Sequence, residues 1–131
     1  MKKHLAIFKK GVGERILDGT KKIETRFSKM KLVPFLQISA GDLVYIKPTG
    51  KDIIGQFRVK KVHFYDGLEK ADIEDIRLKY GGYIAADEEY WERKKTSKYA
   101  SLIFIGQTTP FITSPIKFSK KDLRGWVVLG D

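Results

Sequence analysis

Cysteine is absent from this chain of 131 residues, and only two histidines occur in it. The lack of cysteine excludes disulfides, zinc sites with thiolate ligands and cysteine nucleophiles. His4 and His63 lie far apart in the sequence, and neither has a carboxylate at metal-ligand spacing or a visible Ser or Asp partner. We therefore expect no metal site and no catalytic histidine.

Long apolar runs and nucleotide-binding motifs are absent as well. The N-terminal apolar run covers only residues 5–8, which is too short for a signal-peptide core, and no stretch approaches the length of a membrane span. The segment Gly11-Val12-Gly13 lacks the third glycine and the Lys-Ser/Thr ending of a phosphate loop, and no Gly-x-Ser-x-Gly motif occurs. We expect a soluble, cytoplasmic protein with no cofactor and no membrane partner.

Positive charge, by contrast, is abundant. The formal net charge is +10, from 26 Lys and Arg against 16 Asp and Glu. Such an excess on a small protein is typical of a polyanion partner, RNA or DNA. Lysine-rich surfaces also occur in heat-stable proteins without nucleic-acid function, and this alternative stays open.

The hydrophobic pattern predicts one α+β domain over residues 1–131, because helices interrupt the strands without βαβ regularity. Predicted strands cover residues 4–9, 22–27, 42–47, 53–65, 100–107, 112–118 and 126–129. Predicted helices end at Asp18, cover 71–80 with a stop at Gly81-Gly82, and run from the N-cap Asp87 to about Lys95.

Two irregularities qualify this pattern. The alternation in strand 53–65 changes phase near Lys60-Lys61, which predicts a bulge or bend of the kind that a barrel needs. Residues 28–40 have no clean period and read as a loop. We expect its apolar side chains to fold onto the core; these are Leu32, Val33, Phe35 and Leu36.

The most specific local signal follows the first helix, in the segment 19–26. Gly19 fits the position after a helix where a left-handed backbone favours glycine. In the strand that follows, Glu24 and Arg26 lie on the same face, about 7 Å apart at Cα, which is close enough for their side chains to pair.

This segment resembles the G-x-K-x-x-E-x-R signature of the ASCH domain, with Gly19, Lys21, Glu24 and Arg26 in the four positions. The order of elements over residues 4–109 is similar too, including Gly41-Asp42 before a strand. The resemblance implies a PUA-like fold: a small curved β-barrel or sheet with two or three flanking helices. It also implies an RNA-binding domain, or one that binds or processes modified nucleosides.

The resemblance gives the signature residues roles in a polar cleft. Arg26 is expected to hold Glu24, both are expected to orient a base or sugar, and Lys21 is expected to contact phosphate or an exocyclic oxygen. The alternative is a structural Glu24–Arg26 pair with Lys21 merely solvated. For a functional lysine, Lys21→Ala is expected to change stability by no more than about 0.5 kcal/mol, as surface substitutions do, and yet to impair ligand binding or turnover.

Two further groups extend the predicted interface. Lys47, Arg58 and Lys60 lie among aromatic residues on strands and could follow a nucleic-acid backbone. Trp91 and Tyr99 bracket a basic segment that could form one wall of a nucleotide cleft. The alternative for the basic strand residues is a solvated sheet face. The alternative for Trp91 is a core anchor of its helix.

Two classes of function remain open. A binding module would read RNA or a modified nucleoside. An enzyme in the same cleft would be an amidohydrolase of acylated cytidine, with Lys21 as the family's lysine and Glu24 as a catalytic residue, or a ribonuclease that uses Lys21 and Arg26 electrostatically. Glu24 stands where that amidohydrolase pattern has a threonine.

Overall fold

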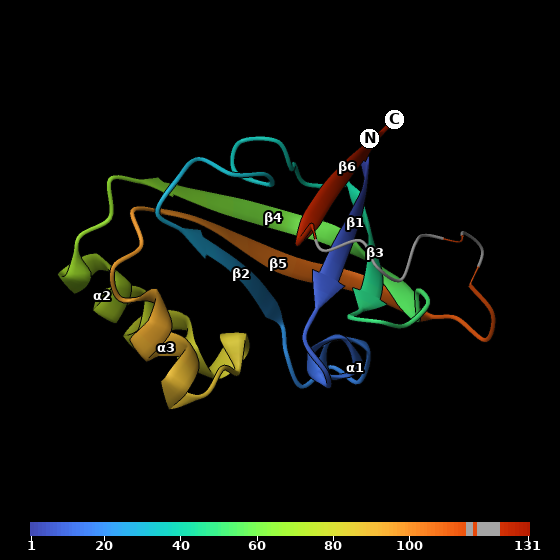
Figure 1. The fold of residues 1–131 in the computed structure, drawn as a ribbon, viewed down its shortest axis with the longest axis horizontal. Helices are drawn as coiled ribbons and strands as arrows, with labels where there is room; N and C mark the ends of the chain where they lie inside the picture. The colour runs from blue at the N-terminus through green and yellow to red at the C-terminus, as the bar shows by residue number, and fades with distance from the viewer. Residues whose placement is uncertain (115–116, 118–123) are drawn as a thin grey trace.

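The computed structural model describes residues 1–114, 117 and 124–131. Its six strands form one sheet in the order β2-β5-β4-β3-β1-β6, which curls into a half-barrel with three helices (Figure 1). The strands are β1 (Lys3–Phe8), β2 (Ile23–Ser28), β3 (Leu43–Pro48), β4 (Gly55–Asp66), β5 (Tyr99–Pro110) and β6 (Trp126–Gly130), and the helices are α1 (Val12–Leu17), α2 (Lys70–Ile84) and α3 (Glu88–Lys94). The predicted α+β class, a curved sheet with two or three flanking helices, is confirmed.

Strand pairing in this sheet is antiparallel except between β1 and β3, which run parallel. The long strands β4 and β5 pair over most of their length, with register shifts on either side of Val59. These shifts confirm the irregularity predicted near Lys60-Lys61 and increase the local twist that curls the sheet.

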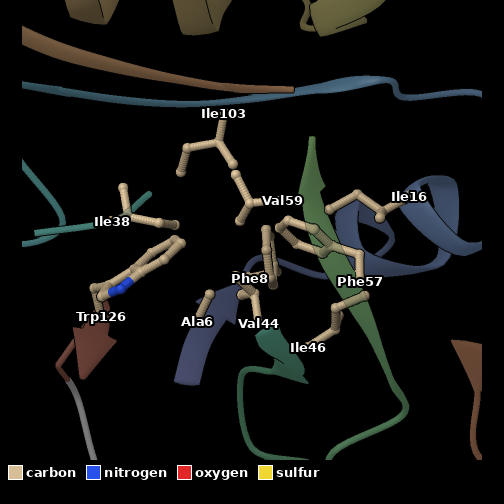
Figure 2. Packing of buried hydrophobic residues seen from close by; sticks show 10 residues of the cluster. All are labelled: Ala6, Phe8, Ile16, Ile38, Val44, Ile46, Phe57, Val59, Ile103 and Trp126. Atoms are coloured by element: carbon tan, nitrogen blue, oxygen red, sulfur yellow. The ribbon is translucent and has the colours of Figure 1, made fainter. Parts of the chain in front are cut away.

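Three hydrophobic clusters occur among the described residues, and the third is the small group Leu5, Leu43, Tyr45 and Ile53. Residues of β1, β3 and β4 contribute most of the first, together with Ile16, Ile38, Ile103 and Trp126 (Figure 2). The second joins Phe27 of β2 to α2 and α3, with Ile84 and Trp91 fully or almost fully buried. The two helices α2 and α3 therefore lie together at one end of the β4–β5 pair (Figure 1).

The predicted stop of α2 at Gly81-Gly82 is wrong, because the helix continues to Ile84 and ends at Ala85 in the left-handed region. Two glycines inside a helix cost about 2 kcal/mol, but Ile84 buries its whole side chain in the second cluster. Packing therefore outweighs helix propensity here.

The loop expectation over residues 28–40 is only partly right. Phe35 is buried against the rings of Phe64 and Tyr99, whereas the three other predicted side chains are exposed: Leu32, Val33 and Leu36. The predicted strand 112–118 falls partly on residues 115–116 and 118, outside the described part of the chain, and residues 112–114 contain no strand.

Candidate functional site

The turn from α1 into β2 brings Lys21 to the centre of the molecule. Gly19 has a φ of 84°, as the sequence predicts, and reverses the chain after α1. The backbone N–H of Lys21 then donates to the Arg15 carbonyl in α1 at 2.9 Å. The backbone N–H of Lys22 donates to the Tyr83 carbonyl in α2 at 2.8 Å. These two bonds fix the start of β2 between α1 and α2.

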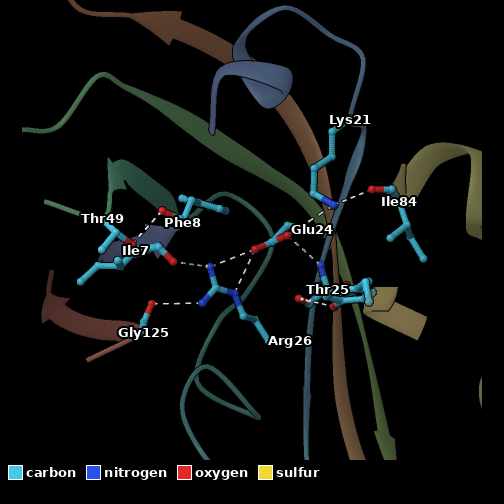
Figure 3. A network of polar contacts seen from close by, with 10 residues as sticks. Ile7, Phe8, Lys21, Glu24, Thr25, Arg26, Thr49, Ile84 and Gly125 are labelled. Atoms are coloured by element: carbon cyan, nitrogen blue, oxygen red, sulfur yellow. Dashed lines mark hydrogen bonds and ion pairs between the residues drawn. The ribbon is translucent and has the colours of Figure 1, made fainter. Parts of the chain in front are cut away.

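Lys21 is a buried lysine with two partners. Only 4% of the residue is exposed, so the solvated alternative is wrong. Its Nζ donates to the Ile84 carbonyl at 2.5 Å and lies 3.5 Å from Glu24 Oε1 (Figure 3). Burial lowers the pKa of Lys21, although the Glu24 carboxylate opposes this effect. An ammonium has three N–H donors, so one is left for a ligand.

Glu24 is saturated by its neighbours. Oε1 accepts the Thr25 backbone N–H at 3.1 Å and lies close to Lys21 Nζ, while Oε2 accepts from Nε of Arg26 and pairs with its terminal nitrogen, both at 2.9 Å. A carboxylate offers about four lone-pair positions. Glu24 therefore serves to hold Lys21 and Arg26 rather than to accept from a ligand.

Arg26 confirms the predicted pairing with Glu24 and adds contacts that the sequence did not indicate. Its two terminal nitrogens donate to the backbone carbonyls of Ile7 and Gly125, both at 3.1 Å (Figure 3). Its guanidinium carbon lies 5.0 Å from the ring centroids of both Phe8 and Trp126. Arg26 thus ties β2 to β1 and to the start of β6.

Two hydroxyl groups lie beside Glu24. The Thr25 side chain and the Tyr90 phenol are 2.5 Å apart, and the phenol also donates to the Thr25 carbonyl at 3.3 Å. Burial, and then the negative charge of Glu24, raise the pKa of Tyr90, so the phenol stays protonated. The pair supplies neutral donors and acceptors next to the charged groups.

These side chains form the floor of a cleft of about 400 Å³. Seven of its lining residues are Lys or Arg, and two are carboxylates. The lining comes from the β1–α1 region (Ile7, Phe8, Lys9, Lys10, Val12, Arg15), from the β2 region (Lys21, Glu24, Thr25, Arg26, Phe27) and from α3 with the residues before it (Ala86, Asp87, Tyr90, Arg93, Lys94). Its size is that of a small-molecule site, and its charge suits an anion.

The structure brings the three signature residues together and leaves the other predicted site residues outside the cleft lining. Lys47 is 1% exposed, with no hydrogen-bond partner for Nζ among the described residues. Trp91 is 5% exposed and packs edge-on against Phe27. The expected exposure of Lys47 is wrong, because β3 is covered on both faces. For Trp91 the burial agrees with the alternative given from the sequence, a core anchor for α3.

The remaining predicted residues are exposed or half-buried and are not part of the cleft lining. Arg58 is exposed on β4 and donates to the Gly41 carbonyl at 2.8 Å. Lys60 is exposed on the same strand, and Tyr99 contacts Phe35 at the start of β5. None of the three lines the cleft.

Sequence reasoning missed Arg93 and Lys94 as individual candidates, although it marked their segment as one wall of a cleft. A signal was present: Tyr90, Arg93 and Lys94 are three and four residues apart, so they share one face of α3. Trp91, one position further, points the other way into the core.

His4 has an acidic partner after all. Its Nε2 lies 2.8 Å from Asp42 Oδ2, and its Nδ1 accepts the Trp126 indole N–H at 3.1 Å. An indole only donates, so Nδ1 carries no proton, and the neutral ring donates to Asp42 from Nε2. All three residues are buried, which makes this a structural network rather than a catalytic one.

The described residues contain no group of three His, Asp or Glu that could hold a metal ion. None of the helices in the described ranges is long and apolar enough to cross a membrane.

No family model matches this sequence, and no curated protein does. Among solved structures, the chain is similar to the crystal structure of ASCH from Zymomonas mobilis, with 16% identity and a TM-score of 0.67 over 83% of this chain and 70% of that one. A mutant of ZmASCH aligns over 98% of this chain and 88% of its own, with 14% identity and a TM-score of 0.73. At identities this low, the structural similarity shows the fold alone. The predicted resemblance is confirmed at that level: the chain has an ASCH-family fold.

Proposed function

We propose that this protein binds RNA or a modified nucleoside in the cleft above Lys21. One observation carries the proposal: a concave site of nucleotide-like size that is lined by seven cationic side chains, two of which, Lys21 and Arg26, belong to its polar floor. Nucleic-acid ligands combine anionic phosphates with polar base edges, and this lining offers a counterpart to both. The shared fold with ASCH proteins points in the same direction.

The floor can distinguish ligands because its groups are held rigidly. Lys21 has one free N–H donor, while Glu24 and the Ile84 carbonyl fix its Nζ in place. The linked hydroxyls of Thr25 and Tyr90 can exchange donor and acceptor roles. A base or sugar that satisfies these groups gains specificity, because buried polar groups left unpaired are costly.

Binding of labelled RNA and of unlabelled nucleosides, by fluorescence anisotropy and calorimetry, tests this function. Lys21→Met keeps the aliphatic length and removes the donor, so we expect affinity to fall at least about tenfold, the loss of one charge-assisted hydrogen bond. Lys98→Ala, an exposed lysine that does not line the cleft, is the matched control. Unchanged affinity in Lys21→Met would place the ligand elsewhere.

A second candidate is hydrolysis of acylated cytidine in the same cleft. The observation that favours it is the lowered pKa of the buried Lys21, because a neutral amine can act as a base toward water. Hydrolysis consumes one water, breaks the amide C–N bond and releases a carboxylic acid and cytidine. Incubation with acylated cytidines and with RNA, followed by product analysis before any affinity measurement, separates this activity and ribonuclease activity from binding alone.

A further inference from the structure

Three cations from the end of β1 and from α3 line one part of the cleft, which we call its rim. Lys9 follows β1 and is exposed, while Arg93 and Lys94 come from the last turn of α3. The Arg93 guanidinium carbon lies 6.0 Å from the centroid of the Tyr90 ring, and Lys94 Nζ lies 5.6 Å from it. All three residues line the same cleft.

Within the described part of the chain, no hydrogen bond or ion pair joins these three side chains to a partner. Of the three carboxylates on α3, two pair outside the cleft: Glu88 with Arg77 and Glu92 with Lys95. The third, Glu89, is not among the residues that line the cleft. No carboxylate of this helix therefore forms an ion pair with its cleft-lining cations in the described part of the chain.

The carboxylates near this rim do not neutralise it. Asp87 accepts the Tyr90 backbone N–H at 2.8 Å as the N-cap of α3, and Glu24 is saturated by Lys21, Thr25 and Arg26. Burial lowers the pKa of Lys94, and the positive charges of Arg93, Lys9 and Arg26 lower it further, while the Glu24 carboxylate opposes the shift without reversing it. Like charges are thus held close together at a cost that a bound anion relieves.

We propose that Lys9, Arg93 and Lys94 form a phosphate subsite, so that the cleft takes a nucleotide unit with its phosphate rather than a free nucleoside. This inference rests on the proposed function and narrows its ligand class. The base or sugar lies toward Lys21 and the Thr25–Tyr90 pair, and the phosphate lies at the rim beside the Tyr90 ring. Arg and Lys are the side chains that hold phosphate through charge-assisted hydrogen bonds.

The test compares three probes by calorimetry at low salt: a nucleoside, its 5′-monophosphate and a short RNA of the same base. The variant is Arg93→Gln with Lys94→Gln, which keeps polar, helix-compatible side chains and removes two charges. Its matched control is Lys95→Gln with Lys98→Gln, which removes two charges outside the cleft lining. A second variant, Lys9→Gln, removes the one subsite cation that follows β1 and leaves the sequence of α3 unchanged.

For the native protein we expect the phosphate-bearing probes to bind at least about tenfold more tightly than the nucleoside. The cleft double variant and Lys9→Gln should reduce this preference and leave nucleoside affinity unchanged, while the control double variant keeps it. If the variants lose affinity only for the RNA, the subsite binds a phosphodiester. If they lose affinity for both the RNA and the 5′-monophosphate, a terminal phosphate is sufficient for binding at the subsite.

Equal affinity of the native protein for nucleoside and nucleotide would overturn the subsite and leave the proposed function intact. A phosphate preference that survives in the cleft variants would also overturn it. Absence of binding for all three probes would remove the proposed function together with the subsite.

Discussion

Arg26 on β2 donates a hydrogen bond of 3.1 Å to the backbone carbonyl of Ile7 on β1. In the sheet these two strands are separated by β5, β4 and β3, so this bond crosses the open side of the half-barrel. The same guanidinium also reaches Gly125 and Glu24. A single side chain therefore joins the two sides of the curled sheet and supports the floor of the cleft.

Arg26→Ala should destabilise the protein by about 1–3 kcal/mol, because it leaves the buried Glu24 carboxylate without its main counter-charge. Arg26→Lys should recover only part of the loss, since an ammonium cannot reproduce the planar contacts to the carboxylate and the two carbonyls. Urea unfolding of both variants measures this, with the exposed Lys60→Ala as control. If Arg26→Ala lowered the free energy of unfolding no more than the control does, the contacts of Arg26 across the half-barrel would not contribute to stability.

Lys21→Ala should also destabilise the protein, by about 1–3 kcal/mol, because it removes the donor to the Ile84 carbonyl and the cation beside Glu24. The sequence alone predicts a change within about 0.5 kcal/mol, as for a surface residue, and this expectation is revised because Lys21 is buried. Lys21→Met should recover stability through its packed stem but not ligand binding. Thermal melts together with the binding assay separate the two roles, and wild-type binding by the Met variant would refute the role of Lys21.

RNA binding should weaken steeply with salt, because lysine and arginine contacts release counterions from the phosphates. Each cleft cation that contacts a phosphate should contribute about 0.7 to the slope for a single strand. Arg93→Gln should therefore flatten the slope, whereas Arg58→Ala and Lys60→Ala should not, since both residues lie outside the cleft lining. Anisotropy titrations over a range of salt concentrations measure the slopes. Equal flattening by the β4 variants would extend the interface over the sheet.

Asp42 should make stability depend on pH. Burial raises the pKa of Asp42, but hydrogen bonds from His4 and from the backbone of Lys2 and Ser39 outweigh it and leave the pKa below its usual value. The ionised carboxylate therefore stabilises the fold above about pH 4, and this contribution is lost as the pH falls through the lowered pKa.

Asp42→Asn should accordingly cost about 1–3 kcal/mol at neutral pH, and the gap to the native protein should narrow in acid. Denaturant unfolding at pH 7 and near pH 3 checks this sign. A gap that widens toward low pH would mean that the network does not depend on the ionised carboxylate.

The sequence predicted the elements well where the signal is local. Gly19 and Asp87 are a turn residue and a helix cap, and each acts on backbone within a few positions of itself. The Glu24–Arg26 pair follows from strand alternation alone. Such features need no knowledge of the rest of the chain, which explains why the α+β pattern and the signature strand were correctly predicted.

The exposure of individual side chains was predicted less well, because it depends on tertiary packing. Strand alternation cannot show that both faces of β3 are covered, so Lys47 was expected at the surface. On α3, a rotation of one residue separates a core position from a cleft position: Trp91 packs on Phe27, and Tyr90 lines the cleft. Which face of α3 meets β2 depends on contacts across more than sixty residues of sequence, as in the Thr25–Tyr90 bond.

The pairing of β1 with β6, together with the Trp126–His4 hydrogen bond, has a kinetic consequence. These partners stand 122 positions apart in the sequence, whereas β4 and β5 pair over a much shorter separation. Contacts of such long range form slowly, because the closure entropy of the intervening chain must be overcome before they contribute. The β4–β5 pair can therefore form early in folding, whereas β1 stays without one neighbour until Trp126 and β6 reach it.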